Sequence, residues 1–246
     1  MSLAKLLRAA RSEILFFACI FGVFLIMRTT AFAMYYIPSE SMLPTLAVGD
    51  RILVNKFAYG YSRHSMPFSI GPEIDTPTGR LFGHLPERGD LVVFKHPTSG
   101  ETLIKRAVGL PGDIIEIRNG HLFINGAEAP REQEAEFRYR EHVGDIASVR
   151  EFRETLPEGR AHEIYERGDF WPGDNFGPAI VPANHLFVMG DNRDNSLDSR
   201  FPAPGVGFLP LENLIGRADV MLFSLNYQRK EAGLERLPRG FLTPLN

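Results

Sequence analysis

A single apolar segment near the N-terminus constrains this chain more than any other feature. Basic residues precede an uncharged run from Ile14 to Met27, which is shorter than the roughly 20 residues that a membrane-spanning helix needs. Small and aromatic residues on its two sides can lengthen it. We therefore expect a transmembrane anchor over residues 13–36, with residues 1–12 in the cytoplasm and the rest of the chain outside, because basic flanks stay on the cytoplasmic side.

A cleaved secretory signal is the main alternative to an anchor. The tripeptide Ala31-Phe32-Ala33 resembles the A-x-A site at which signal peptides are cut. We favour an uncleaved anchor, because cleavage after Ala33 would leave the segment around Ser41 close to a new, free N-terminus. Cleavage of the chain by itself at this site is a hypothesis. A buried core helix is a third interpretation, disfavoured because both flanks resemble residues of a membrane interface.

Composition excludes several classes of protein. With 246 residues the chain can bury a sizeable core, as one domain or as a domain that carries a smaller subdomain. The formal net charge of −3, without a basic stripe interleaved with aromatic residues, gives no reason to expect a nucleic-acid partner. Cys19, the only cysteine, lies in the apolar run, which excludes intrachain disulfides, cysteine-based metal sites and cysteine catalysis in the rest of the chain.

The chain after the apolar segment has the pattern of a β protein. Its 23 Gly and 18 Pro residues favour many turns, and short aliphatic runs recur between them. Asn119-Gly120 separates two such runs, which is a strong hairpin signal because both residues tolerate positive φ. Residues 59–87 are loop-like, and residues 127–182 are charged and poorly periodic. We expect both stretches to be insertions in a β core.

Three segments far apart in sequence carry residue types used in nucleophilic catalysis. Residues 38–45 hold two serines between prolines, residues 105–109 begin with a lysine, and residues 190–200 form a polar, turn-rich loop. A serine hydroxyl is a poor nucleophile until a base takes its proton. None of the seven histidines has a neighbourhood that suggests this role, so a Ser-His-Asp triad is disfavoured. Taken singly, each segment also fits an ordinary loop or strand.

A lysine serves as the base only when it is neutral. Its reference pKa near 10.4 leaves about 0.04% neutral at pH 7, so the site must lower the pKa by removing the ammonium from water. Lys105 suits this role, since period-2 alternation places it on the same strand face as the apolar Leu103 and Ala107, with Arg106 on the other face. By itself, Lys105 also fits a strand lysine whose ammonium reaches solvent.

A calcium site is the alternative for the segment at 190–200. Asp194, Ser196 and Asp198 alternate as calcium ligands do, but the Gly of an EF-hand loop and its closing Glu are missing from the sequence. We therefore expect neither a metal ion nor another cofactor.

Together, the segments closely resemble the motifs of bacterial type I signal peptidases, the membrane-bound serine proteases that use a Ser–Lys dyad. The family's Pro-Ser-x-Ser-Met-x-Pro-Thr-Leu motif matches residues 38–46, and its Arg-Gly-Asp-Val/Ile-Val-Val-Phe motif matches residues 88–94, with Leu91 at the variable position. Its Lys-Arg-x-x-Gly-x-Pro-Gly-Asp motif matches residues 105–113, and its Gly-Asp-Asn-x-x-x-Ser-x-Asp-Ser-Arg motif matches residues 190–200. The four motifs follow one another in the order that the family shows.

The resemblance implies a role for each matched polar residue. It implies a nucleophile and its base, donors for an oxyanion hole, a hydroxyl that orients the base, and an ion-paired scaffold that keeps its acid charged. These are Ser41 as nucleophile, Lys105 as general base, Ser39 with the backbone N–H of Ser41 as oxyanion hole, Ser196 as the orienting hydroxyl, and Asp198, Arg200 and Arg106 as scaffold.

The resemblance also implies a mainly β fold with antiparallel sheets. The catalytic domain would span 37–126 and 183–246, a smaller β subdomain would be inserted at 127–182, and one N-terminal transmembrane helix would precede them. Substrates would be secretory preproteins, cut after small residues at positions −1 and −3. Cleavage would take place on the outer, periplasmic face of the bacterial cytoplasmic membrane, where the shared lipid bilayer raises the effective concentration of substrate.

The chain departs from the best-known Gram-negative members of that family in two respects. It shows one anchor where they have two, and it lacks a cysteine pair in the inserted subdomain. Two alternative functions stay open at this point. One is a specialised peptidase that processes a single substrate, and the other is a non-catalytic β module tethered to the membrane.

Overall fold

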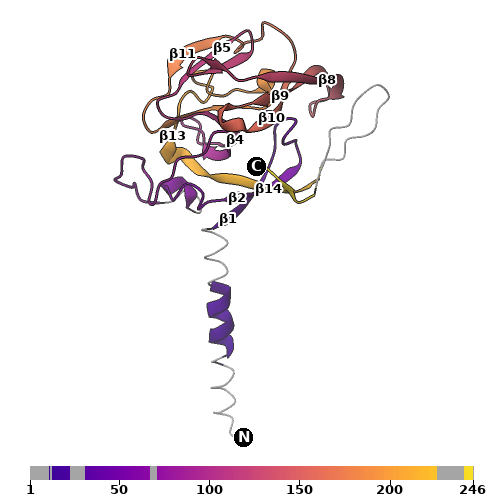
Figure 1. Ribbon diagram of the computed structural model, residues 1–246. Coiled ribbons are helices and arrows are strands. Elements are labelled where there is room, and N and C mark those ends of the chain that lie inside the picture. The colour runs from indigo at the N-terminus through magenta and orange to yellow at the C-terminus, as the bar shows by residue number, and fades with distance from the viewer. Residues whose placement is uncertain (1–10, 12, 23–30, 67–70, 226–240, 246) are drawn as a thin grey trace, which may run out of the picture.

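The computed structural model describes residues 11, 13–22, 31–66, 71–225 and 241–245, and it confirms a mainly β protein built from antiparallel sheets (Figure 1). The largest sheet has the strand order β1-β2-β14-β3-β4-β12-β13, and β15 pairs with β14. Its strands are β1 (Phe32–Tyr36), β2 (Asp50–Asn55), β3 (Leu91–Lys95), β4 (Thr102–Gly109), β12 (His185–Met189), β13 (Leu209–Pro210), β14 (Leu214–Ser224) and β15 (Thr243–Pro244).

Two smaller sheets complete the architecture. One has the order β11-β5-β6-β7 and the other the order β10-β9-β8, and every strand pair in them is antiparallel. Figure 1 shows β5 and β11 at the end of the body opposite β1 and β2. Their strands are β5 (Ile114–Arg118), β6 (His121–Ile124), β7 (Ala127–Glu128), β8 (Arg131–Arg140), β9 (Ile146–Thr155), β10 (Ala161–Glu166) and β11 (Phe176–Ile180).

The turn between β5 and β6 has the conformation that its sequence predicts. Asn119 and Gly120 have φ of 50° and 78°, as a tight hairpin turn requires. The expected domain boundary at residue 127, however, runs through a sheet. Strands β5 and β6, on the catalytic side of that boundary, share their sheet with β11 from the expected insertion, because β11 supplies hydrogen bonds to the open edge of β5. Residues 131–166 form a separate three-stranded sheet.

Alternating burial along the central strands fixes the two faces of the main sheet. Leu91 and Val93 of β3 belong to one apolar cluster, whereas Val92 and Phe94 belong to another, so both faces of this strand are buried. Short 3-10 turns connect the strands. They are η1 (Arg63–Ser65), η3 (Pro157–Gly159), η4 (Arg193–Asn195) and η5 (Leu211–Asn213).

The expected anchor over residues 13–36 needs correction at its C-terminal end. Residues 13–22 are helical, and residues 23–30 lie outside the described part of the chain. Phe32–Tyr36, however, forms β1, an edge strand whose five residues pair with β2 from Asn55 back to Arg51. Within the ranges that the structure describes, no helix has both the length and the hydropathy that a membrane crossing requires.

Candidate active site

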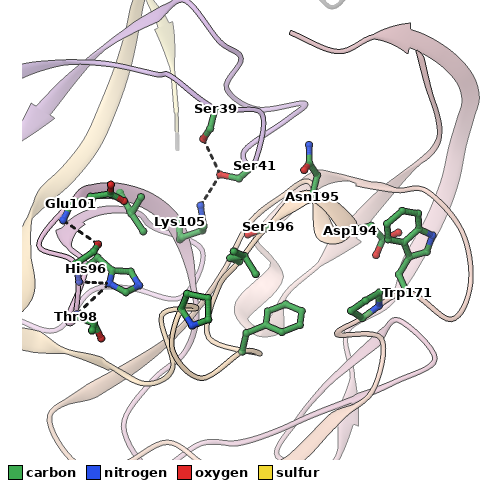
Figure 2. A pocket seen from close by; sticks show the side chains of 16 residues that line it. Ser39, Ser41, His96, Thr98, Glu101, Lys105, Trp171, Asp194, Asn195 and Ser196 are labelled. Carbon is green, nitrogen blue, oxygen red and sulfur yellow. Dashed lines mark hydrogen bonds between the residues drawn. The ribbon is translucent and has the colours of Figure 1, made fainter. Parts of the chain in front are cut away.

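Ser41 and Lys105 lie in direct contact although 64 residues separate them. Ser41 belongs to the connection between β1 and β2, where Leu46 N–H donates to the carbonyl of Met42 at 2.7 Å and closes a turn just after the serine. Lys105 projects from the middle of β4. Its Nζ donates to Ser41 Oγ at 2.6 Å (Figure 2) and to the carbonyl of Ile104 at 3.0 Å. The sheet therefore holds a lysine nitrogen against a serine hydroxyl.

Burial favours the neutral form of this lysine. Only 4% of Lys105 is exposed, and removal of its ammonium from water lowers its pKa to about 8, against the opposing charges of Asp198 and Asp191. At that pKa about a tenth of the side chains are neutral at pH 7, roughly 200-fold more than for an ordinary lysine. Both faces of β4 are covered at this point, because Ile104 and Arg106 are buried as well as Lys105 and Ala107.

Two further hydroxyls expected at the site surround this pair. Ser39 Oγ lies 3.5 Å from Ser41 Oγ, and both serines line the same cavity as Ser196. Ser196 is buried in the wall of this cavity, but no hydrogen bond joins its Oγ to Lys105 Nζ. The hydrogen bond expected from Ser196 to the lysine is thus not formed in this structure, and its orienting role stays a prediction.

The two loops that flank Lys105 approach each other without space for a side chain. A Cβ atom at Gly190 would lie 2.3 Å from Ser196 Oγ and 2.5 Å from the carbonyl oxygen of Ser41. Asn192 N–H donates to that same carbonyl at 3.1 Å. Any residue larger than glycine at position 190 would push the loop of Ser41 away from the segment at 190–200.

The ion pairs expected as a scaffold divide into two. Arg200 contacts Asp198 through Nε at 2.9 Å and Nη2 at 2.9 Å, as expected. Burial raises the pKa of Asp198, but Arg200 outweighs this effect and holds the pKa below its usual value. Arg106 does not join that pair. It contacts Asp191, which also accepts a hydrogen bond from Thr45 Oγ1 at 2.6 Å.

Asp191 and Thr45 were missed as site residues by sequence reasoning. Each lies within a matched motif, which was the available signal, but neither has a role that its residue type alone reveals. Arg106 and Lys105 are successive residues whose side chains take opposite faces of β4. The structure therefore places Arg106 on the side of the strand where Asp191 is buried, 1% exposed.

Two cavities meet at Ser41 and Lys105, and both are also lined by Ser39 and Leu103. The larger, of about 740 Å³, continues past Ser196 to Trp171 (Figure 2). The smaller, of about 110 Å³, is mainly apolar. Besides the four shared residues, the smaller one is lined by Tyr35, Tyr36, Ile37, Pro38, Met42, Ile52, Val93, Thr102 and Ile104.

The part of the chain that resembles known proteins contains all of these site residues. The profile of the family described as "Signal peptidase, peptidase S26" matches residues 10–223. The chain belongs to this family. As a member of the signal peptidase family it is a serine endopeptidase of the kind that removes signal peptides, and the resemblance inferred from the motifs is confirmed. The alternative of a non-catalytic β module is therefore wrong.

Relatives within the signal peptidase family match most of the chain. The signal peptidase I of Rickettsia typhi is 34% identical over 225 residues, covering 88% of this chain and 81% of the relative. That of Rickettsia akari is 32% identical over 239 residues, covering 94% and 86%. A crystal structure of a signal peptidase I from Enterococcus faecalis V583 matches with a TM-score of 0.33 and 24% identity, covering 55% of this chain and 97% of that one.

Two buried histidines of this signal peptidase, His96 and His162, form no hydrogen bond with Ser41. His96 lines the larger cavity, but its Nδ1 accepts hydrogen bonds from the backbone of Thr98 and Ser99, and its Nε2 lies 3.1 Å from the carbonyl of Gly205. His162 is buried away from the serine, and burial lowers its pKa to about 4. In the described part of the chain, no three His, Cys, Asp or Glu residues gather as metal ligands would.

Proposed function

We propose that this chain is a membrane-bound signal peptidase in which Ser41 is the nucleophile and Lys105 the general base. The observation that carries the proposal is the 2.6 Å contact between a buried lysine nitrogen and a serine hydroxyl at the junction of two cavities. Burial favours the neutral amine, and only the neutral amine can accept the proton of Ser41.

The geometry supports a two-step acyl transfer. Neutral Lys105 takes the hydroxyl proton while Ser41 Oγ attacks the scissile carbonyl carbon, which gives a tetrahedral oxyanion and a lysine ammonium. The ammonium then returns the proton to the leaving amine, and the peptide bond breaks to leave an ester on Ser41. Water attacks this ester with Lys105 again as the base, and its hydrolysis frees Ser41.

The oxyanion requires hydrogen-bond donors on the side of Ser41 away from the base. We assign this role to the hydroxyl of Ser39 and the backbone N–H of Ser41. The 3.5 Å separation of the two Oγ atoms supports this assignment, because a carbonyl attacked by Ser41 then lies within reach of Ser39. Asp198, Arg200 and Arg106 are assigned a structural role, since each is engaged in a buried ion pair.

Specificity for small residues at −1 and −3 follows from the smaller cavity. Its 110 Å³ and its apolar wall suit methyl-sized side chains better than large or charged ones. Alternate side chains of an extended substrate point to the same side, so the side chains at −1 and −3 both face the smaller cavity. Secretory preproteins that carry small residues at these two positions are the substrates we assign.

Attachment to the bacterial cytoplasmic membrane completes the proposal, with the sheets, β1 included, on the outer, periplasmic face. The helix at 13–22 supports it through its surface, which exposes large apolar side chains that water does not favour. A shared bilayer raises the effective concentration of an anchored preprotein at the site. The exposed residues are Ile14, Leu15, Phe16, Phe17, Ile20 and Phe21.

Cleavage of purified preproteins tests the proposal. The wild-type chain in detergent should cut a preprotein with Ala at −1 and −3 at one bond, identified by mass spectrometry, whereas Ser41→Ala and Lys105→Met should not. Ser99→Ala, at the exposed rim of the larger cavity, is the control that should still cut. Cleavage by either dyad variant would remove the assignment, and a single accepted preprotein among many would favour the specialised peptidase instead.

A further inference from the structure

The nucleophile segment and the 190–200 segment are joined by side-chain as well as backbone hydrogen bonds. Asn192 Nδ2 donates to the carbonyl of Glu40 at 3.0 Å, next to the bond from Asn192 N–H to the carbonyl of Ser41. The position of Ser41 relative to Lys105 therefore depends on where Asn192 is held. The residues that hold Asn192 come from the three-stranded sheet β8–β10, which the proposed chemistry does not use.

This sheet packs directly against the nucleophile segment. Its apolar face shares a buried cluster with Leu43 and Ala47, which follow Ser41 closely in sequence. At the tip of the β8–β9 hairpin, the backbone N–H of His142 donates to Glu40 Oε1 at 2.8 Å. The sheet thus contacts the residue immediately before the nucleophile. The members of the cluster that the sheet supplies are Tyr139, Ala147, Val149 and Tyr165.

The same sheet also holds the 190–200 segment. Tyr165 N–H on β10 donates to the carbonyl of Asp191 at 2.9 Å, and Tyr165 forms a parallel bridge with Asn192. Glu154 on β9 then contacts Arg193 with both carboxylate oxygens, one of them at 2.9 Å from Nη1. The exposed fractions of these two side chains are 0% and 3%, so the pair is buried between the sheet and the loop.

Arg193 passes this contact on to the rest of the loop. Its backbone carbonyl accepts a hydrogen bond from Arg200 Nη2 at 2.5 Å, and Arg200 is bound to Asp198. A charge as buried as that of Arg193 is tolerated only beside its counter-ion. The loop is therefore confined to the one position in which Arg193 reaches Glu154, and Ser196, three residues further on, is fixed with it.

We propose that the sheet β8–β10 is a positioning element for the Ser41–Lys105 pair, and that Glu154, acting through Arg193, is its principal positioning residue. The inference rests on the proposed function and assigns a task to the inserted strands. The sheet touches both loops that enclose Lys105 and no reacting atom. Its effect is to keep the loops closed over the amine so that water stays out and the serine stays within reach.

The test compares Glu154→Gln with Glu163→Gln. The first keeps the shape of the side chain but removes the carboxylate that binds the Arg193 guanidinium, whereas Glu163 forms an exposed pair with Arg153 on the same sheet. We expect kcat of Glu154→Gln to fall about 10- to 100-fold with KM nearly unchanged, as for small displacements of reacting groups. Glu163→Gln should behave as the wild type does.

A second readout is the titration of Lys105 itself, followed by NMR of ε-13C-labelled lysine and assigned with Lys105→Met. Burial, Asp198, Asp191 and Arg200 are the influences that act on its pKa. If the loops open in Glu154→Gln, water reaches the ammonium, so the pKa should rise and the acid limb of the rate profile should move to higher pH. A substitution that only lowered stability would shift neither.

Val149→Ala keeps the inference testable if Glu154→Gln does not fold. This substitution removes two methyl groups from the apolar cluster that contains Leu43 and Ala47, and it leaves no buried charge unpaired. Val143→Ala, at an 80% exposed position of the same hairpin, is its control. Folded variants of Glu154 and Val149 with the wild-type kcat and the wild-type Lys105 titration would overturn the positioning role. A wild type that cuts no preprotein would overturn the proposed function instead, because the lysine titration needs no turnover.

Discussion

Arg106 binds Asp191 through two hydrogen bonds, from Nε to Oδ1 at 2.8 Å and from Nη2 to Oδ2 at 2.6 Å, one residue along β4 from the lysine that contacts Ser41. Asp198 and Asp191 are the two buried acids whose charges favour a proton on Lys105. Because Arg106 pairs with Asp191, the charge of Asp191 opposes the neutral form of Lys105 less than an unpaired carboxylate would. Adjacent residues of β4 therefore have different tasks: Arg106 stays charged and pairs with Asp191, whereas Lys105 titrates.

Loss of this pair should destabilise the protein strongly. Arg106→Met leaves the Asp191 carboxylate buried without a counter-ion, which we expect to lower the free energy of unfolding by about 3–5 kcal/mol. Arg153→Met removes an exposed ion pair with Glu163 and should cost less than about 1 kcal/mol. Urea denaturation of the two variants measures the difference. Equal losses would show that the Arg106 pair is not the buried contact described above.

Catalysis should follow the ionisation of Lys105. If the neutral amine is the base, as proposed, and its pKa is about 8, kcat/KM should rise tenfold per pH unit below pH 8 and level off above it. Initial rates of preprotein cleavage between pH 5.5 and pH 10, with folding checked by circular dichroism at each pH, give the profile. A flat profile across pH 6–9 would count against a lysine base.

Stability should respond to the same group with a defined sign. The pKa of Lys105 is about 8 in the folded chain, so the unfolded chain binds more protons between about pH 8 and pH 10.4. Burial of this lysine thus costs stability below pH 8, and the cost disappears as the pH rises to about 10.4, by about 3 kcal/mol in all. The stability gap between Lys105→Met and wild type should narrow across that window. A constant gap would contradict a depressed pKa.

Removal of the Ser39 hydroxyl should affect the transition state more than substrate binding. Ser39→Ala deletes one expected oxyanion donor, so kcat should fall by about 10²–10³ with KM little changed. Ser39→Thr keeps a hydroxyl and should retain more activity. Steady-state kinetics on one preprotein give both constants. A rise in KM with unchanged kcat would place Ser39 in ground-state binding instead.

Local pattern made part of this molecule predictable. The alternation of Leu103, Lys105 and Ala107 is a property of one strand, and the Asn119-Gly120 turn is a property of two residues, so both could be inferred without the rest of the chain. The motifs supplied the catalytic candidates through resemblance. The strand alternation, the turn and the motifs could all be recognised because each depends only on residues close together in the sequence.

Long-range pairing made the rest unpredictable. The partners of Arg106 and Arg193 lie 85 and 39 residues away, and a buried ion pair leaves no mark in either local sequence. The same reason explains β1, whose aromatic residues suit a membrane interface and an edge strand equally, until pairing with β2 decides between them. Pairing of β11 with β5 is likewise not visible in local sequence, because it depends on the open edge that β5 presents in the folded sheet.

The bond from Asn192 to the carbonyl of Ser41 has a consequence for biosynthesis. A ribosome that adds about 5–20 residues per second needs roughly 8 to 30 s to travel from codon 41 to codon 192. Throughout that interval the serine has been made, yet the loop that fixes it does not exist. A nascent chain therefore lacks the hydrogen bonds from Asn192 to the nucleophile segment until Asn192 has been added and has folded against it.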